Sequence, residues 1–470
     1  MSKIQRRVFM MGAATAAVGG QAAAQPGKKY LLIDPRVILR STGARKALGQ
    51  VVKEGRNPLF AEDKPWEARF DNLYANVLRD ERSGEYRCWY SPFLIDEAVT
   101  STPRAERLKT PYKPRKREMG VCYAVSKDGL RWEKPELGLV EFDGSRRNNI
   151  VSRGPHGAGL WRDDLEKDPR RRYKMFFRGK TMAGLFSADG LRWEEPTAFS
   201  AIDAPGDTHN NWFWSPERNA YVGITRLSDR QSRQRLVGRT ESRDFVTWTK
   251  AEEVLRALPS DGKRQAYAMP VFSHSGLYFG LLMMFDSDTD RVHCELALST
   301  DTVTWERVCP GVPLIGNGVE GAYDWGCVYA AARPVVLDNG EIRLYYGASN
   351  GKHTSWRDGF FCLARLRPDG FAGLEAESAK TVARVVTAPV TVSGKRLTVT
   401  ADAANGSIRA GIVGDVEKLG IDRCVAVKGD VTGRRVEWKG ATLQALGGRQ
   451  VQIEFELSGA ARLYSFGFEG

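Results

Sequence analysis

A seven-residue pattern, Ser-x-Asp-x-x-x-Trp, occurs four times in the sequence, and this repetition constrains the fold more than any other feature. The copies recur at intervals of about 55 to 61 residues, at positions 126–132, 187–193, 242–248 and 299–305. An apolar run leads into each serine, so we expect a β-strand to end there. Serine and aspartate side chains bond nearby backbone amides and close tight turns, and we expect each tryptophan to cover its turn from the core side. The pattern therefore predicts a repeat fold.

Each repeat unit reads as a meander of four antiparallel strands. Three apolar runs are separated by turn residues, and the fourth strand is expected to open at the tryptophan. A fifth unit carries Pro368-Asp369-Gly370 in place of the pattern. Short strands at this spacing also occur in β-sandwiches, but a turn that returns four times favours radial repetition. We predict an all-β chain whose residues 25–375 form a five-bladed β-propeller, with blades at about 70–140, 155–200, 207–255, 264–312 and 322–375.

The two ends of the chain differ from the repeat. Residues 376–470 show short alternating strands with glycine turns, which is typical of a C-terminal β-sandwich. Residues 30–33 form a strand-like run that we expect to complete the last blade and close the ring. Residues 1–24 contain Arg6-Arg7, a short apolar run and a small-residue cleavage site, and so resemble a twin-arginine export signal. An ordinary secretory signal is the alternative, and both predict a periplasmic or extracellular protein. No other stretch is long and apolar enough to cross a membrane.

The chain is strongly basic, with a formal net charge of +13 at pH 7. Part of the excess lies in residues 104–117, which read either as a solvated loop or as a contact for a polyanion. The partner we expect is a glycan, neutral or acidic. Nothing in the sequence resembles a nucleic-acid-binding module, so no nucleic-acid partner is expected.

The seven cysteines do not predict a metal site, because no Cys-x-x-Cys or His-rich cluster accompanies them. Cys88, Cys122, Cys294 and Cys362 fall inside expected strands, where buried free thiols are the usual outcome. No metal and no cofactor are expected.

Acidic residues occur where the first strand of most blades is expected to begin. In a propeller these first strands line the central channel, so residues at the same offset of several blades meet at one open face. One such acid alone would read as a turn or capping residue, but several around one axis repel and raise one another's pKa. Glycoside hydrolysis uses two carboxyl groups of this kind, one ionised and one protonated. The candidate acids are Asp71, Asp163, Asp207, Glu320 and Asp324.

Five blades, acids at the first strands and a C-terminal sandwich resemble glycoside hydrolase family 32 and its furanosidase relatives, and more closely exported bacterial proteins described as family-32-like or sialidase-like. The matching residues are Pro65-Trp66-Glu67, 167–174, Gly206-Asp207-Thr208-His209-Asn210, 323–326 and 462–466. The family's Asn-Asp-Pro-Asn-Gly is replaced by Phe70-Asp71-Asn72-Leu73, its Arg-Asp-Pro by Arg162-Asp163-Asp164, and its Glu-Cys motif has no counterpart. These departures argue against fructan hydrolysis. The repeated turns also resemble the Asp-box of sialidases, which is structural.

The resemblance implies an exported glycoside hydrolase that acts on a furanoside or another glycan. We expect Asp71 to act as nucleophile or base, Asp163 as transition-state stabiliser and Glu320 as proton donor, with Asp207 and Asp324 as rivals. The sugar site would be lined by Trp66, Glu67, Arg162, His209, Asn210, Tyr267 and Trp325. A non-catalytic carbohydrate-binding propeller is one alternative. A polysaccharide lyase is another, and would need His209 or Tyr267 as a base beside a basic residue.

Overall fold

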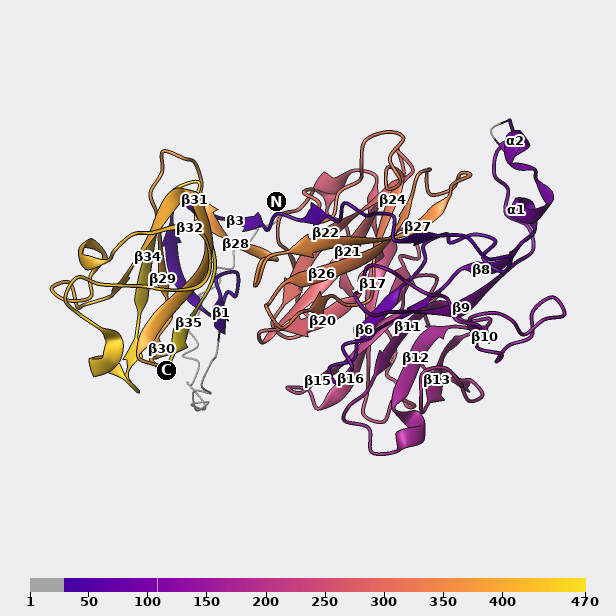
Figure 1. Cartoon of the computed structure of the whole chain (residues 1–470), viewed down its shortest axis with the longest axis horizontal. Helices are drawn as coiled ribbons and strands as arrows, with labels where there is room; N and C mark the ends of the chain where they lie inside the picture. Colours follow the sequence, from indigo (N-terminus) through magenta and orange to yellow (C-terminus); the bar gives the residue numbers. More distant parts are fainter. Residues whose placement is uncertain (1–28, 108) are drawn as a thin grey trace, which may run out of the picture.

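The computed structural model describes residues 29–107 and 109–470, so the expected export signal at 1–24 lies outside the described residues. The described chain forms two lobes of unequal size (Figure 1). It is nearly all β, because its only α-helices are the short α1 (Glu97–Ser101) and α2 (Arg104–Arg107). The coarse prediction of an all-β chain is confirmed. Within these ranges no helix combines the length and apolar character needed to cross a membrane.

The larger lobe begins with three antiparallel sheets that follow one another along the chain. Strands adjacent in sequence pair directly, as a meander requires. In the first sheet β8 (Phe93–Asp96) also pairs with β9. The strands are β6 (Asn76–Arg79), β7 (Tyr86–Tyr90), β9 (Arg117–Ser126) and β10 (Ile150–Arg153) in the first sheet, β11 (His156–Arg162), β12 (Tyr173–Arg178), β13 (Met182–Ser187) and β14 (Thr197–Ala198) in the second, and β15 (Asn211–Ser215), β16 (Ala220–Ser228), β17 (Arg235–Ser242) and β18 (Glu252–Leu255) in the third.

An 11-stranded sheet completes the larger lobe. It consists of two antiparallel meanders joined by one parallel pair, Val292 with Cys327. The first meander contains β19 (Arg264–Ala268), β20 (Val271–His274), β21 (Leu277–Asp286), β22 (Arg291–Ser299) and β23 (Glu306–Arg307), and the second β24 (Cys327–Ala330), β25 (Val335–Val336), β26 (Ile342–Ser349) and β27 (Gly359–Leu366).

The N-terminal segment completes the second of these meanders. Its strands β4 (Val52–Lys53) and β5 (Phe60–Ala61) both pair with β27. The sequence predicts this closure for residues 30–33, but β1 (Lys29–Leu31) pairs with a strand of the smaller lobe instead. The N-terminal segment thus adds strands to this meander, but residues 52–61 provide them and residues 30–33 do not.

The four repeated turns have nearly the same hydrogen bonds. In the first, Ser126 Oγ accepts from the amide of Gly129 at 2.8 Å, and Asp128 Oδ1 accepts from the amides of Leu130 and Arg131, each at 2.8 Å. The equivalent aspartates of the other copies accept the same pair of amides. The residue after each aspartate has a positive φ, which explains why two copies use glycine there. The predicted turn chemistry is confirmed.

The fourth strands of the first three units begin later than the sequence predicts, whereas β23 of the fourth unit follows its tryptophan directly, as expected. In the first unit residue 133 forms only an isolated bridge to Val125, and the outer strand is β10. In the second and third units the outer strands are β14 and β18, several residues beyond the tryptophan. The tryptophan side chain packs on the turn and the neighbouring sheet, as in the contacts of Trp132 with Tyr345 and Phe361. The backbone beside the tryptophan makes only one or two hydrogen bonds to the third strand, as between Glu133 and Val125, before the regular outer strand begins.

The smaller lobe draws its strands from both ends of the chain. Its nine-stranded sheet has the order β2-β29-β34-β31-β35-β28-β3, with β1 on β35 and β32 on β31. The predicted boundaries assign β1 to β3 and β28 to the propeller, whereas the structure places them here. Sequence position does not reveal pairing across such distances, and the β-sandwich stays a prediction. The strands are β2 (Ile38–Thr42), β3 (Ala44–Leu48), β28 (Ala372–Ala376), β29 (Ala383–Thr387), β31 (Arg396–Ile412), β32 (Val427–Arg435), β34 (Ile453–Gly459) and β35 (Arg462–Glu469), with β30 (Val390–Thr391) and β33 (Gln450–Val451) as a separate pair.

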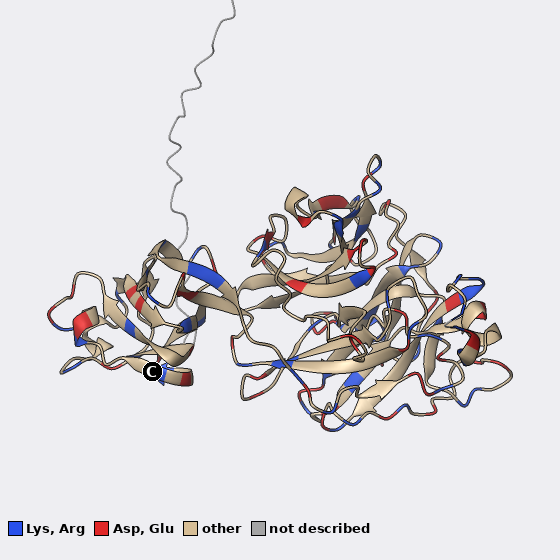
Figure 2. Cartoon of the chain, turned by 90° about the horizontal axis from the view of Figure 1, so that it is seen from above, with Lys and Arg blue, Asp and Glu red and all other residues tan. Residues whose placement is uncertain are grey.

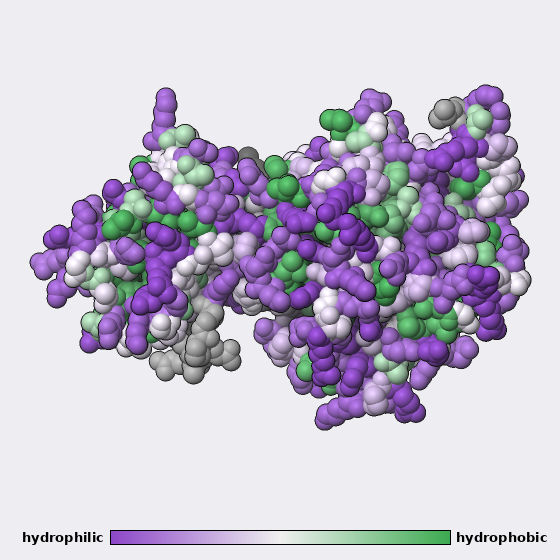
Figure 3. Space-filling view, in the orientation of Figure 1, coloured by the Kyte–Doolittle hydropathy of each residue, from purple (hydrophilic) through white to green (hydrophobic). Residues whose placement is uncertain are grey.

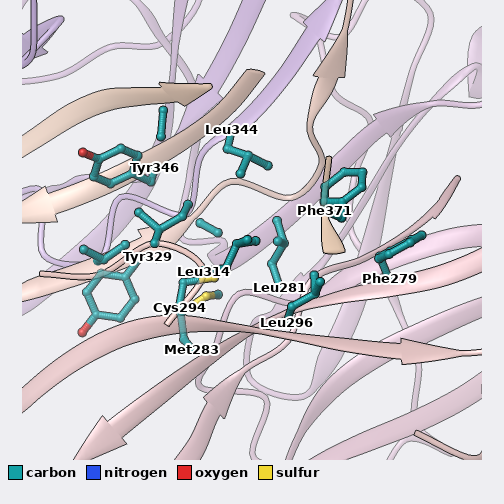
Figure 4. Close-up of a cluster of buried hydrophobic side chains, with 14 of the residues drawn as sticks. Phe279, Leu281, Met283, Cys294, Leu296, Leu314, Tyr329, Leu344, Tyr346 and Phe371 are labelled. Atoms are coloured by element: carbon teal, nitrogen blue, oxygen red, sulfur yellow. The ribbon is translucent and has the colours of Figure 1, made fainter. Parts of the chain in front are cut away.

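The apolar core has one large cluster centred on each lobe, and the cluster of the larger lobe also includes Leu31 of β1 and Ala372 of β28. The largest core cluster packs β21 and β22 against β24 and β26, with Leu281, Leu296 and Leu344 among its members (Figure 4). The smaller lobe has a separate cluster around Phe455 and Phe466. All seven cysteines are free, and the four that the sequence places in strands are buried, as predicted. The face in Figure 3 is mostly hydrophilic, and basic and acidic residues are interspersed over both lobes (Figure 2).

Candidate functional site

A cavity of about 970 Å³ opens on the larger lobe where the first strands of successive sheets begin. Asp71 and Tyr74 precede β6, His156 opens β11, Asp207 precedes β15, and Tyr267 lies in β19. Of the residues that the sequence places at this offset, Asp71, Asp207 and Tyr267 line the cavity. The loop after β26 and the segment between β8 and β9 form the remaining walls.

Asp71 lies in the cavity wall on a backbone that side chains rarely adopt. Asp71, Leu73 and Tyr74 have φ angles of 42°, 62° and 43°. For residues other than glycine, such conformations cost about 1–3 kcal/mol each and concentrate at functional sites. The surrounding structure thus holds this turn in a strained shape.

Two buried arginines fix one oxygen of Asp71. Arg357 Nη2 donates to Asp71 Oδ1 at 2.7 Å and Arg69 Nε donates to the same oxygen at 3.2 Å. Burial alone would raise the pKa of this carboxyl, but Arg357 and Arg69 outweigh burial and hold the pKa below its ordinary value. None of the hydrogen bonds among the described residues reaches Oδ2. Asp71 is thus an ionised carboxylate with one oxygen available to a ligand.

Asp207 is the second carboxylate of the cavity. Its Oδ2 accepts from Arg226, and its Oδ1 lies 2.8 Å from Nε2 of His156. Burial would raise the pKa of Asp207, but the contacts with His156 and Arg226 lower it below the ordinary value. Both cavity carboxylates are therefore ionised at neutral pH, so neither is the protonated partner that the sequence analysis expects.

Two tyrosine hydroxyls lie near these carboxylates. Asn72 Nδ2 donates to Tyr74 Oη at 2.7 Å and to Tyr267 Oη at 3.0 Å. Burial, together with the charges of Asp71 and Asp207, raises the pKa of both tyrosines. Neither hydroxyl donates to another described residue, so each keeps a proton that it can offer to a ligand oxygen.

One histidine of the cavity is held neutral. Nδ1 of His353 shares a hydrogen bond of 2.7 Å with the hydroxyl of Tyr329. Burial, reinforced by the charge of Arg357, lowers the pKa of His353 to about 3. His209 does not line the cavity, although its ring lies 5.3 Å from the ring of Tyr74. Its burial likewise lowers its pKa to about 3.

The basic segment at 104–117 forms a strap beside the cavity. The cavity is lined by four residues of the strap, Arg107, Lys109, Tyr112 and Arg117. Tyr112 packs under the guanidinium of Arg69, which lies 4.1 Å from the ring centroid. Trp356 Nε1 donates to the carbonyl of Thr110 at 2.6 Å, which ties the strap to the loop after β26. The strap thus brings basic side chains to the site.

The structure places the other candidate acids away from this cavity. Asp163 is buried and accepts from Lys174 Nζ at 2.7 Å and from Tyr221 Oη at 2.6 Å. Asp324 is buried and accepts from Lys53 Nζ at 2.5 Å and from Tyr346 at 3.2 Å. Glu320 is exposed on the loop before β24. Asp163 and Asp324 thus form internal ion pairs, and the five candidate acids do not converge on one site.

Of the predicted sugar contacts, only Tyr267 lines the cavity. Trp66 Nε1 donates to Asn149, Glu67 pairs with buried Lys134, and Arg162 pairs with Asp80 and Asp164. Asn210 is buried and donates to backbone carbonyls, including that of Gly206 at 2.9 Å. Trp325 lies under the guanidinium of Arg291. These contacts describe side chains that hold the fold together.

Sequence reasoning missed most of the basic residues of the site. Arg69, Arg226, Arg235, His156 and His353 are not among its candidates. Only the run at 104–117 gave a signal, as an open choice between a solvated loop and a polyanion contact. Arg235 lies at the start of β17, the third strand of its sheet, whereas the sequence-based candidates were sought only before the first strands.

Comparison with known proteins gives structural similarity only. No family model matches the chain, and no curated protein matches it significantly. Similar solved structures include beta-1,2-mannobiose phosphorylase from Listeria innocua, with 14% sequence identity and a TM-score of 0.46, over 68% of this chain and 97% of that chain. A glycosyl hydrolase from Bacteroides ovatus has 14% identity and a TM-score of 0.45, over 68% and 95%.

A third similar structure is described as belonging to the GH130 family of mannoside phosphorylases, which contains glycoside hydrolases that target beta-1,2 mannosidic linkages in Candida mannan. It has 13% identity and a TM-score of 0.42, over 67% of this chain and 94% of that chain. The similar structures thus carry glycosidase names in general, and the resemblance to family 32 stays a prediction.

Proposed function

We propose that the protein hydrolyses glycosidic bonds, with Asp71 as base or nucleophile. The observation that carries the proposal is the ionised Asp71 carboxylate, whose Oδ1 is fixed by two arginines and whose Oδ2 has no partner among the described residues. A carboxylate held in one orientation is prepared to activate water or attack a sugar carbon. The strained turn around Asp71 supports the same assignment.

In this proposal the proton donor is the pair of His156 and Asp207. The imidazole Nε2 lies 2.8 Å from Asp207 Oδ1, so the carboxylate orients the ring at the cavity wall. Because Nε2 is engaged by Asp207, the other ring nitrogen, Nδ1, would carry the proton that passes to the leaving glycosidic oxygen. Tyr74 and Tyr267 would donate hydrogen bonds to sugar hydroxyls, and the rings of Tyr112 and Trp356 would contact sugar C–H faces.

Hydrolysis fits the site better than elimination by a lyase. A lyase needs a base beside a basic residue, and the raised pKa of Tyr267 keeps its hydroxyl protonated at neutral pH. Asp71, by contrast, carries its charge there. In a non-catalytic binding protein the free oxygen of Asp71 would accept a hydrogen bond from a sugar hydroxyl, and the product assay below separates that role from hydrolysis.

The proposal is tested by incubating the purified mature protein with neutral and acidic plant and bacterial glycans and analysing the products by mass spectrometry. Products heavier than the internal residues by one water establish hydrolysis, and Asp71→Asn is expected to reduce their formation by about 10³-fold. Asp288→Asn, at an exposed turn between β21 and β22, is the matched control. An unsaturated product would instead establish elimination. Binding without any product would leave the carbohydrate-binding function.

The finer architecture and the location belong to the same proposal. The three meander sheets and the two meanders of the 11-stranded sheet would be five blades around the channel that opens at the cavity. The segment at 1–24 would direct export to the periplasm or beyond. Replacing Arg6 and Arg7 by lysine and following the protein by cell fractionation tests the export, because retention in the cytoplasm is the expected result.

A further inference from the structure

The cavity carries more basic than acidic side chains. Arg69, Arg107, Lys109, Arg117 and Arg235 line it, against two carboxylates, Asp71 and Asp207. The two carboxylates are already paired, Asp71 with Arg69 and Arg357 and Asp207 with Arg226. Most of the basic residues of the wall are therefore not neutralised by the acids of the same cavity.

Arg235 is the clearest case of a basic group without an acidic partner. It is half-buried, and no carboxylate of the described chain lies within 4.0 Å of its nitrogens, since its polar partner is Gln265 Oε1, which accepts from Nη1 at 2.9 Å. Its guanidinium lies 5.5 Å from the ring centroid of Tyr267 and 5.1 Å from that of Phe285. Removing a charge from water without a counter-charge is unfavourable, so an anion bound from outside would stabilise this guanidinium.

Arg69 contributes a second donor that lacks an acceptor. Its side chain is 2% exposed, and its Nη1 has no hydrogen-bond partner among the described residues. Nε and Nη2 are engaged by Asp71 and by the carbonyl of Ser355. Buried polar atoms almost always have partners, and Arg69 lines the cavity, so its Nη1 is a candidate donor for a ligand oxygen.

The strap extends the positive wall outwards. Arg117 lies over the ring of Phe93 at 4.6 Å, and Arg107 lies over the ring of Trp356 at 5.4 Å. Arg107 donates to the carbonyls of Thr102 and Val99, and no ion pair to a carboxylate is formed by either arginine within the described ranges. Both guanidinium groups are thus held in place and remain available to an anion.

We propose that the cavity binds an acidic sugar residue, with Arg235 as the docking group for its carboxylate or sulfate and with Arg69 Nη1 as a second donor. This inference rests on the proposed function for the cleavage of the bound chain, but the binding it describes does not require cleavage. Guanidinium groups match the planar oxygens of carboxylate and sulfate and make stronger hydrogen bonds to them than to neutral oxygens. The strap arginines would bind acidic groups on neighbouring sugar residues.

The test is a binding measurement by isothermal titration calorimetry on the full mature protein. The probes are tri-galacturonate as the uronate, a carrageenan tetrasaccharide as the sulfate ester, and carboxyl-reduced tri-galacturonate as the neutral analogue. The variants are Arg235→Met, which keeps an apolar stem against Tyr267 and Phe285, and Arg449→Gln as a matched control at an exposed arginine of the smaller lobe. Thermal unfolding of each variant confirms that it is folded.

At least one acidic probe is expected to bind about 10- to 100-fold more tightly than the neutral analogue, the range that one charge-assisted contact supplies. Arg235→Met is expected to remove this preference and Arg449→Gln to retain it. The probe that shows the preference distinguishes uronate from sulfate. Equal binding of acidic and neutral probes, a preference that survives in Arg235→Met, or no binding of any probe would overturn the inference. Acidic binding without cleavage would uphold the anion site and count against the proposed hydrolysis alone.

Discussion

Replacing Asp71 by asparagine separates the catalytic role of this residue from its structural role. The change keeps the shape of the side chain but removes the charge that faces Arg357 and Arg69, whose side chains are 1% and 2% exposed. Breaking a buried ion pair by removing one partner costs about 3–5 kcal/mol. The melting temperature is therefore expected to fall by on the order of 10 °C.

The activity of Asp71→Asn is expected to fall further than this loss of stability can explain. A general base contributes about 10²- to 10⁴-fold to the rate, so kcat/KM on a cleaved glycan should fall by about 10³-fold at a temperature where the variant is folded. In the double variant Asp71→Asn/Arg357→Met, one unpaired buried charge is removed as well. Its melting temperature should recover in part while its activity stays lost.

The assay measures initial rates of sugar release at several substrate concentrations, together with thermal unfolding of the same samples. If folded Asp71→Asn kept more than a tenth of the wild-type kcat/KM, the base assignment would be refuted. If the double variant regained activity along with stability, the role of Asp71 would be structural only.

Three further predictions concern stability. Burial raises the pKa of Glu62 to about 7, from 4.5 in the unfolded chain, so the contribution of this carboxyl group to folding stability is fully present below pH 4.5 and is lost as the pH rises through 7. Glu62→Gln should therefore stabilise the protein by up to about 3 kcal/mol at pH 8 and little at pH 4. Denaturant unfolding that shows equal effects at both pH values would contradict this. Asp128→Ala removes two amide hydrogen bonds of 2.8 Å from the first turn and should lower the free energy of unfolding by about 1–2 kcal/mol without changing kcat. A loss of activity at unchanged stability would be inconsistent with a structural turn. Lys174→Met leaves Asp163 buried without its cation and should lower the free energy of unfolding by about 3–5 kcal/mol. The double variant Lys174→Met/Asp163→Asn should recover part of this loss in urea unfolding, and no recovery would show that the pair is not coupled.

The local elements were predictable because their signals lie close together in the sequence. A serine and an aspartate two positions apart are enough to satisfy the amides of one turn, and four copies expose the repeat. The outer strands are less predictable, because β10, β14 and β18 begin several residues or more after the tryptophan of their unit. The pairing of β1 with β35 could not be predicted from the sequence, because no local pattern encodes a partner at the other end of the chain.

The site was predictable only where it follows the repeat. Asp71, Asp207 and Tyr267 lie at the expected offset and line the cavity. Asp163 lies at a similar offset, but Lys174, directly opposite Trp161 in the neighbouring strand, draws it into an internal ion pair. The basic wall comes from a third strand, from the loop after β26 and from the strap, and its residues meet only through the fold.

The sharing of strands between the two ends of the chain sets an order of events during synthesis. Among the described strands, β1, β2 and β3 leave the ribosome before the others. Strand β1 pairs with β35, which is made about 400 residues later, or about 20–80 s at about 5–20 residues per second. During that time these three short strands have unpaired edges, and unpaired strand edges promote aggregation. Arg40, Arg45 and Lys46 lie within β2 and β3, and such charges are a known protection of free edges. Of the described strands, those made first are thus also those that must stay soluble longest before they pair.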